Sequence, residues 1–249
     1  MDKPFSKMTV LVTGGSRGIG RAIAIRFASV GMNVIINYNT NVEEANETAR
    51  LCMQQGGKPV TLAANVANRE DVMRMKEKLD RLQLQPDIVV NNAGVSHFGL
   101  LSDVNDEDWD HLVGVNLKGM YLCSQLFMPY MITQRYGRFI NVSSIWGETG
   151  ASCEVLYSMT KGGVNAFTKA LAKELAPSQI TVNAVAPGVV LTDMISPINE
   201  NDQQSLRDEI PAGRFANPDE IASLVYFLAL PESSYINGQI ISPNGGYVT

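Results

Sequence analysis

Two residues one helical turn apart suggest the first chemistry that this sequence could perform. Tyr157 and Lys161 are four positions apart, so in a helix they project from the same face. A phenol with an ordinary pKa of about 10 is a poor proton donor or base at pH 7. A neighbouring ammonium favours the phenolate and lowers that pKa. The pair therefore predicts a proton-transfer site, provided that residues 154–176 form a helix.

A glycine-rich stretch predicts a second site, for a dinucleotide. Residues 13–20 read Thr-Gly-Gly-Ser-Arg-Gly-Ile-Gly, between a β-rich run at 8–13 and a helical pattern at 18–30. Such glycines let the backbone turn sharply and approach a pyrophosphate, and the amides that open the helix then face its charge. The predicted contacts are Gly14, Gly15, Ser16, Arg17, Gly18, Ile19 and Gly20.

The residues after the second predicted strand bear on the choice between NAD and NADP. An NAD enzyme usually places Asp or Glu there, to bind the ribose 2′-hydroxyl. Residues 37–40 read Asn-Tyr-Asn-Thr and contain no carboxylate. Arg17, in the glycine-rich loop, can offer a planar bidentate donor to a 2′-phosphate. We therefore predict NADP(H) as cofactor, with Asn39 and Thr40 among the residues that bind it.

Apolar runs and helical patterns alternate along the chain, which predicts a parallel sheet covered on both faces. Right-handed crossovers then give a doubly wound, Rossmann-type α/β fold. We see no linker or repeat and expect one domain over residues 1–249. Residues 194–212 carry few structural signals, and we expect a mobile segment that folds over the substrate. The predicted strands are 8–13, 34–37, 60–64, 87–90, 137–142, 180–185 and 239–242, and the predicted helices are 18–30, 42–55, 69–83, 106–134, 154–176 and 218–229.

Composition excludes several other classes of protein. The net charge of −5 and the lack of Lys/Arg runs argue against a nucleic-acid partner. No apolar run reaches the roughly 18 residues that span a bilayer, and residues 1–7 do not resemble a signal peptide. We expect a cytoplasmic protein without a membrane partner. Three cysteines (Cys52, Cys123, Cys153) and two histidines lack metal-ligand spacing, so we expect no metal.

The motifs together resemble the short-chain dehydrogenase/reductase family. The glycine spacing Gly-x-x-x-Gly-x-Gly and the Tyr-x-x-x-Lys pair match it, as do Asn-Asn-Ala-Gly at 91–94, Pro-Gly at 187–188, Asn-Gly-Gln at 237–239 and Asn-Gly-Gly at 244–246. The resemblance implies a homotetramer. It also implies further cofactor contacts at Asn65, Val66, Asn92, Ala93, Gly94, Tyr157, Lys161, Pro187, Gly188, Val190 and Thr192.

The resemblance also assigns catalytic roles. Ser144 stands thirteen residues before Tyr157, which is the family spacing, and is therefore preferred to its neighbour Ser143. Asn116 occupies the position of the family's fourth catalytic residue and would support a water chain to Lys161. The implied reaction adds hydride from NADPH to a ketone, while Ser144 polarises the carbonyl oxygen and Tyr157 protonates it. The predicted product is a secondary alcohol.

Among its relatives the sequence most resembles bacterial 3-oxoacyl-acyl-carrier-protein reductases of fatty acid synthesis. An acidic carrier protein should meet cations near the site. Arg135 matches one docking arginine of those reductases, but the second position is Ser178, and Lys169 or Lys173 would have to compensate. We place this interpretation first, because the activity covers most relatives.

Glu154 supports an alternative substrate. It stands where the carrier-protein reductases have a neutral glutamine that lines the substrate site, so it would favour a cationic or hydrogen-bond-donating substrate. Residues 143–147 and 151–155 also resemble the branch that reduces a 5-aminopentanone group on elongation factor P, a substrate with an amine. Glu154 could instead point to solvent or cap its helix. The predicted substrate contacts are Ser144, Glu154 and Tyr157.

A different class of function is a non-catalytic NADP-binding sensor or scaffold. Such a protein would be expected to lack Ser144, Tyr157 or Lys161. All three residues are present, so we place this alternative last.

Overall fold

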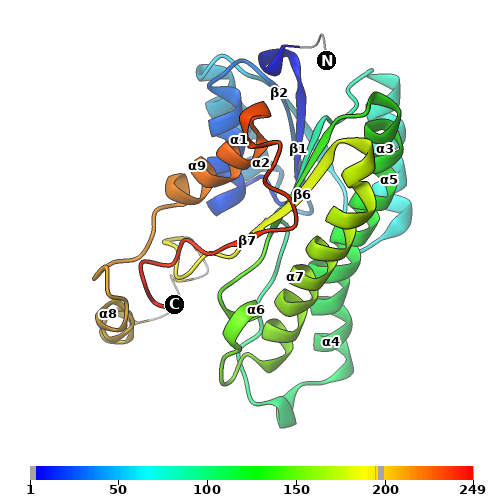
Figure 1. Ribbon diagram of the computed structural model, residues 1–249. Helices are drawn as coiled ribbons and strands as arrows, with labels where there is room; N and C mark the ends of the chain where they lie inside the picture. Colours follow the sequence, from blue (N-terminus) through cyan, green and yellow to red (C-terminus); the bar gives the residue numbers. More distant parts are fainter. Residues whose placement is uncertain (1–3, 194, 196–198, 249) are drawn as a thin grey trace.

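A computed structural model of the chain describes residues 4–193, 195 and 199–248. Its centre is a seven-stranded sheet with the strand order β3-β2-β1-β4-β5-β6-β7 (Figure 1), in which every pairing is parallel. The order reverses between β1 and β4, which defines a doubly wound sheet. The predicted fold class is confirmed. The strands are β1 (Thr9–Val12), β2 (Asn33–Tyr38), β3 (Lys58–Ala63), β4 (Ile88–Asn91), β5 (Gly137–Val142), β6 (Ile180–Val185) and β7 (Ile240–Ile241).

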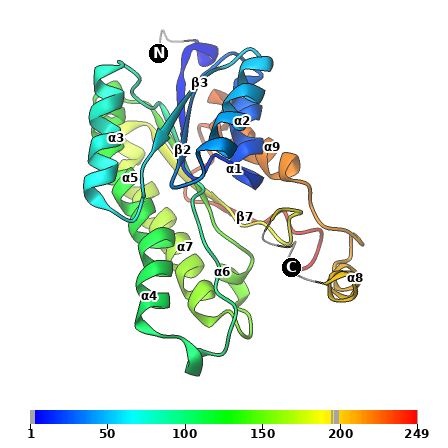
Figure 2. The same cartoon turned by 180° about the vertical axis from the view of Figure 1, so that it is seen from behind.

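Helices cover both faces of the sheet, as predicted (Figures 1 and 2). One layer contains α1 (Gly18–Ala28), α2 (Val42–Gln54) and α9 (Pro218–Ala229), and the other contains α3 (Arg69–Arg81), α5 (Gly119–Gln134) and α7 (Val155–Leu175). Successive residues of a strand point to opposite faces. In β1, Val10 and Val12 therefore pack into the core under α1 and α9, and Leu11 packs into the core under α5 and α7.

The helical stretch predicted at 106–134 contains a change of helix type. It consists of α4 (Asp106–Val113), a π-helical segment (Gly114–Lys118) and α5. Short π segments inside α-helices are frequent at functional sites. The segment carries Asn116, one of the predicted catalytic residues, and turns its side chain into the protein.

Two helices were not predicted. The short α6 (Trp146–Thr149) follows the end of β5, and α8 (Glu200–Glu209) lies within the segment expected to be mobile. Asn199 begins α8, because its side chain accepts a hydrogen bond from the amide of Asp202. Residues 194 and 196–198 of that segment lie outside the described residues. Of the helices that the structure describes, none has both the length and the apolar character to cross a membrane.

Candidate active site

The predicted cofactor loop and the segment after β4 meet at the point where the strand order reverses, the usual ligand position in such sheets. Thr13 joins them, because its Oγ1 donates to the carbonyl of Val90 (3.3 Å) and accepts from the amides of Asn92 and Ala93 (both 3.0 Å). The Asn92 side chain donates to the carbonyls of Thr13 and Gly14, at 2.9 and 3.1 Å. The structure therefore gives Asn92 a role in fixing the loop. Thr13 belongs to the glycine-rich sequence motif, but the motif alone gives it no function.

Two of the loop glycines are required by close packing. A Cβ at Gly20 would lie 2.2 Å from the carbonyl oxygen of Gly14. Gly14 has a φ of +60°, and its Cβ would lie 3.0 Å from the Cα of Ala93. Larger residues at either position would push the loop away from the end of β4.

The N-terminus of α1 fits a pyrophosphate. The helices α2, α3 and α4 each begin at an asparagine (Asn41, Asn68 and Asn105) whose side chain bonds a first-turn amide. In contrast, α1 begins after Arg17, and no side chain caps it. Its first-turn amides can therefore donate to a bound anion. The role of residues 14–20 in binding a dinucleotide stays a prediction.

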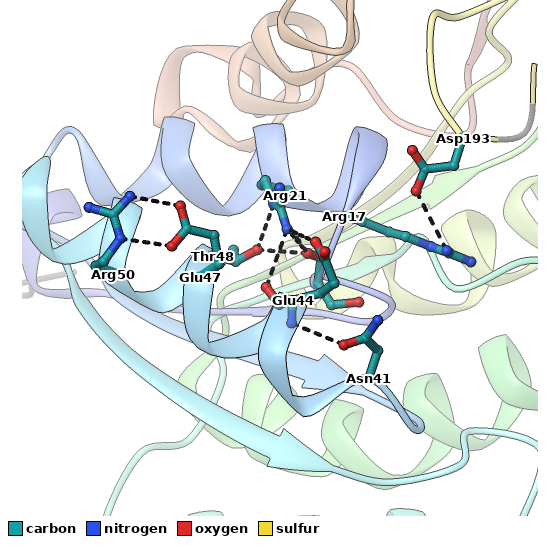
Figure 3. Close-up of polar contacts among 9 residues, drawn as sticks. Arg17, Arg21, Asn41, Glu44, Glu47, Thr48, Arg50 and Asp193 are labelled. Carbon is teal, nitrogen blue, oxygen red and sulfur yellow. Dashed lines mark hydrogen bonds and ion pairs between the residues drawn. The ribbon is translucent and has the colours of Figure 1, made fainter. Parts of the chain in front are cut away.

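The predicted nucleotide-selecting residues lie beside this loop. Asn39 and Thr40 follow β2 and are exposed. Arg17 is also exposed and forms an ion pair with Asp193 (Figure 3), with 3.5 Å between Nη1 and Oδ2. Arg21 was not predicted as part of the site, but its Nη2 donates to the carbonyl of Ser16 (2.7 Å). It thereby fastens the glycine-rich loop to its own helix.

The other predicted cofactor residues lie on loops at the same edge of the sheet. After β6, the carbonyl of Pro187 accepts from the amide of Ile145 (3.1 Å), and Val190 is buried. The Thr192 methyl lies 3.3 Å from the position of a Cβ on Gly18. After β3 comes Asn65, whose Oδ1 accepts from the amide of Ala67 (3.0 Å), followed by the buried Val66. Gly188, which follows Pro187, packs against Asn244.

Tyr157 and Lys161 lie on one face of α7, as the spacing predicts. Lys161 is only 4% exposed, and its Nζ donates to the carbonyl of Val142 (2.9 Å) at the end of β5. The same Nζ lies 5.5 Å from the centre of the Tyr157 ring. Burial disfavours the charged form and lowers the pKa of Lys161 to about 8.

The two adjacent serines after β5 have different partners. The hydroxyl of Ser144 accepts a hydrogen bond from the amide of Trp146 (3.2 Å), and its interaction with the phenol of Tyr157 lowers the pKa of that phenol. The hydroxyl of Ser143 donates instead to Asn165 Oδ1 (2.7 Å) and the carbonyl of Lys161 (3.2 Å). The structure thus brings Ser144 to Tyr157, whereas Ser143 holds α7 against the sheet.

The pKa of Tyr157 departs from the sequence-based expectation. Burial raises it to about 12; the hydrogen bond from Ser144 lowers it, and the charge of Glu154 raises it. The expected net lowering is wrong for this state, because burial outweighs the other influences and Lys161 is not among the groups that shift this pKa. A neutral phenol at pH 7 is the protonation state that a proton donor needs.

Asn116 connects the π segment to the site. Its Oδ1 accepts from the amide of Val95 (2.9 Å), and its Nδ2 donates to the carbonyl of Val95 (2.9 Å) and to Thr160 Oγ1 (3.1 Å). A Cβ at Gly94 would lie 3.4 Å from Asn116 Oδ1 and 3.5 Å from Lys161 Nζ. The asparagine therefore fixes the loop after β4 beside Lys161. The water chain stays a prediction.

Glu154, at the N-terminus of α7, has a partly buried side chain and forms no side-chain hydrogen bond to the amides of its helix. Its Oε2 is buried and, among the described residues, has no hydrogen-bond partner. Burial raises the pKa of this carboxyl. Since its charge acts on Tyr157, this carboxyl lies close to the phenol.

The predicted carrier-docking position is far from this group. Arg135 is exposed at the end of α5, just before β5, and donates to the carbonyl of Pro177 (3.2 Å). Ser144 follows the opposite end of β5. A strand of this length spans about 20 Å at roughly 3.3 Å per residue. A carrier bound at Arg135 would thus not lie over Tyr157 of the same chain.

Comparison with known proteins identifies the family. Residues 14–248 match the family model described as Enoyl-(Acyl carrier protein) reductase. The chain is 45% identical to YmfI of Bacillus subtilis, described as an uncharacterized oxidoreductase, over 96% of this chain and 98% of that protein. It is 44% identical to the 3-oxoacyl-[acyl-carrier-protein] reductase FabG of Aquifex aeolicus, over 95% of each chain.

A solved structure agrees with these relatives. A variant of a short-chain dehydrogenase/reductase from Serratia marcescens superposes with a TM-score of 0.92 and 32% identity, covering 99% of this chain and 100% of that one. The chain belongs to the short-chain dehydrogenase/reductase family and is an oxidoreductase. The predicted resemblance is confirmed.

Proposed function

We propose that this oxidoreductase uses NADPH to reduce a ketone, carried on a protein, to a secondary alcohol. The observation that carries the reaction type is the arrangement of the Tyr157 phenol, which interacts with Ser144 and lies beside the buried Lys161. When bound, the reduced nicotinamide supplies the hydride. Ser144 then donates a hydrogen bond to the carbonyl oxygen, and Tyr157 donates the proton that this oxygen needs.

The preference for NADPH is supported by charge. The stretch 37–40 at the end of β2 has no carboxylate to repel a 2′-phosphate, and Arg17 is exposed in the adjacent loop. Arg17→Ala should therefore weaken NADPH binding far more than NADH binding. Equal effects on both cofactors would refute the assignment.

Two substrates are candidates. The name of the Aquifex relative supports a 3-oxoacyl group on acyl carrier protein. The geometry of Glu154 supports the 5-aminopentanone group on elongation factor P. Its buried Oε2 has no hydrogen-bond partner among the described residues and would gain an ion pair with the substrate's amine. Without such a partner, burial of that carboxyl costs free energy. On this observation we favour the amine-bearing ketone.

A paired substrate assay tests the choice. Purified protein with NADPH is given either acetoacetyl-acyl carrier protein or aminopentanone-modified elongation factor P. We expect faster turnover of the second substrate. Glu154→Gln should reduce its kcat/KM by roughly 30-fold or more, as expected for removing one partner of a buried charge pair, without harming thioester reduction. Glu148→Gln makes the same chemical change at an exposed position on α6 and serves as control.

The other outcomes separate the alternatives. If the thioester is reduced faster than the aminopentanone substrate, and Glu154→Gln changes the turnover of neither, the protein is a carrier-protein reductase. That result would contradict the amine proposal. No NADPH consumption with either substrate, or with other short ketones, would support the sensor or scaffold class.

A further inference from the structure

The cation expected to meet the cofactor's 2′-phosphate is already paired within the protein. Arg17 extends away from Arg21 and toward Asp193 (Figure 3). Its Nη1 lies 3.5 Å from Oδ2 of Asp193. Asp193 follows Thr192, whose methyl packs near Gly18 of the glycine-rich loop. The loop after β6 therefore places the carboxylate of Asp193 beside the guanidinium of Arg17, which the cofactor's 2′-phosphate would need as its partner.

Glu44, an acidic side chain on α2, is already held by another cation. Glu44 pairs with Arg21, whose guanidinium also bonds the Thr48 hydroxyl (Nε, 2.9 Å) and the Ser16 carbonyl (Nη2, 2.7 Å) (Figure 3). This network fixes Glu44 and compensates its charge on the α2 side of the loop. Asp193 is the carboxylate that pairs with Arg17.

We propose that Asp193 is a specificity-determining residue, which competes with the cofactor's 2′-phosphate for Arg17. This inference rests on the proposed preference for NADPH. Binding of the phosphate requires Arg17 to exchange one anion for another, whereas NAD(H) has no group that makes this demand. Asp193 thus weakens the binding of NADP(H) and leaves that of NAD(H) unchanged.

The size of the effect follows from exposure. The side chains of Arg17 and Asp193 are 65% and 70% exposed, so solvent screens their attraction. Exposed pairs of this kind change an equilibrium constant by about two- to fivefold. A phosphate offers the guanidinium a bidentate, doubly charged partner, which can displace the single carboxylate.

Equilibrium binding of cofactor fragments tests the proposal without catalysis. The full-length protein is titrated by calorimetry with 2′,5′-ADP and with 5′-AMP, which lacks the 2′-phosphate. Asp193→Asn should bind 2′,5′-ADP about two- to fivefold more tightly and 5′-AMP as the wild type does. The gain should shrink at about 1 M KCl, where screening is strong. It should vanish in the Arg17→Ala background, which removes the shared cation.

Glu47→Gln provides the matched control. Glu47 lies on the same side of the molecule as Arg17, and its carboxylate forms an ion pair with Arg50 at 2.7 Å (Figure 3). The substitution removes the same single negative charge without touching Arg17, so both affinities should stay at wild-type values. A tightening in Glu47→Gln equal to that in Asp193→Asn would show a general effect of net charge and overturn the proposal.

Two further results distinguish the failure of this inference from that of the proposed cofactor. If Arg17→Ala weakens 2′,5′-ADP selectively but Asp193→Asn changes nothing, or tightens both fragments equally, only the competition is refuted. If Arg17→Ala weakens both fragments equally, the 2′-phosphate does not bind at Arg17, and the proposed NADPH preference fails together with this inference.

Discussion

Lys161 carries a buried charge, which should lower the unfolding free energy of the protein. It is 4% exposed, and burial lowers its pKa from 10.5 to about 8. A drop of this size corresponds to about 3 kcal/mol, at 1.36 kcal/mol for each pH unit. Lys161→Met keeps the length of the side chain and removes the charge, but it loses the hydrogen bond to Val142, worth about 1 kcal/mol. The variant should therefore be more stable than the wild type by about 2 kcal/mol at pH 7.

The pH dependence of this difference has a definite sign. The folded protein releases the Lys161 proton at about pH 8, and the unfolded chain releases it at about 10.5. The penalty on the wild type is thus complete below about pH 8 and disappears as the pH rises toward 10.5. The stability difference between variant and wild type should shrink over that range.

Urea unfolding, followed by tryptophan fluorescence at pH 7 and pH 10, measures this difference directly. Lys169→Met, at an exposed position on the same helix, should show neither the gain in stability nor its pH dependence. Lys161→Met should also lose ketone reduction. A variant less stable than the wild type at pH 7, or a difference that does not change with pH, would refute the reasoning.

Other predictions concern the serines and the pH profile. Ser144→Ala should lower kcat by about 10²- to 10³-fold with little loss of stability. Ser143→Ala should keep most activity but lose about 1–2 kcal/mol of unfolding free energy, because Asn165 loses its buried donor; the reverse pattern would exchange the two assignments. The rate of ketone reduction should be constant up to about pH 8 and fall above it as Lys161 loses its proton, while Tyr157 stays protonated to about 12. A rate that rises between pH 8 and pH 10 would contradict this order of titration.

The strands were the most predictable part of the fold. Every residue of β1, β4, β5 and β6 is buried, and each strand is short and mostly apolar, a pattern that the sequence reveals directly. The helices α1, α3 and α7 present apolar residues at helical spacing. The predicted boundaries agree with the structure to within about two residues.

Elements without such a pattern could not be predicted. Apolar periodicity does not distinguish an α-helix from one that contains a π segment, so the change at 114–118 is absent from the prediction. The helix α8 has no buried residue and therefore no apolar stripe. Its remaining signals were the cap at Asn199 and an acidic first turn.

The candidate site also has features that the sequence predicts and features that it does not. The motifs place Ser144, Tyr157 and Lys161 together, because each belongs to a segment of known spacing. Burial is not encoded in that spacing, so the raised pKa of Tyr157 and the unpartnered Oε2 of Glu154 emerged only from the structure. The pairing of Arg17 with Asp193 joins residues 176 positions apart in sequence, and no local pattern indicates it.

The central claim is that the Tyr157 phenol donates the proton to a ketone that is reduced with NADPH. Tyr157→Phe removes the hydroxyl and retains the ring. The decisive measurement compares this variant with the wild type for NADPH binding, by cofactor fluorescence, and for turnover of the better ketone substrate. The account predicts that NADPH still binds and that turnover falls by about 10²- to 10⁴-fold. Turnover close to that of the wild type, with NADPH bound, would contradict it.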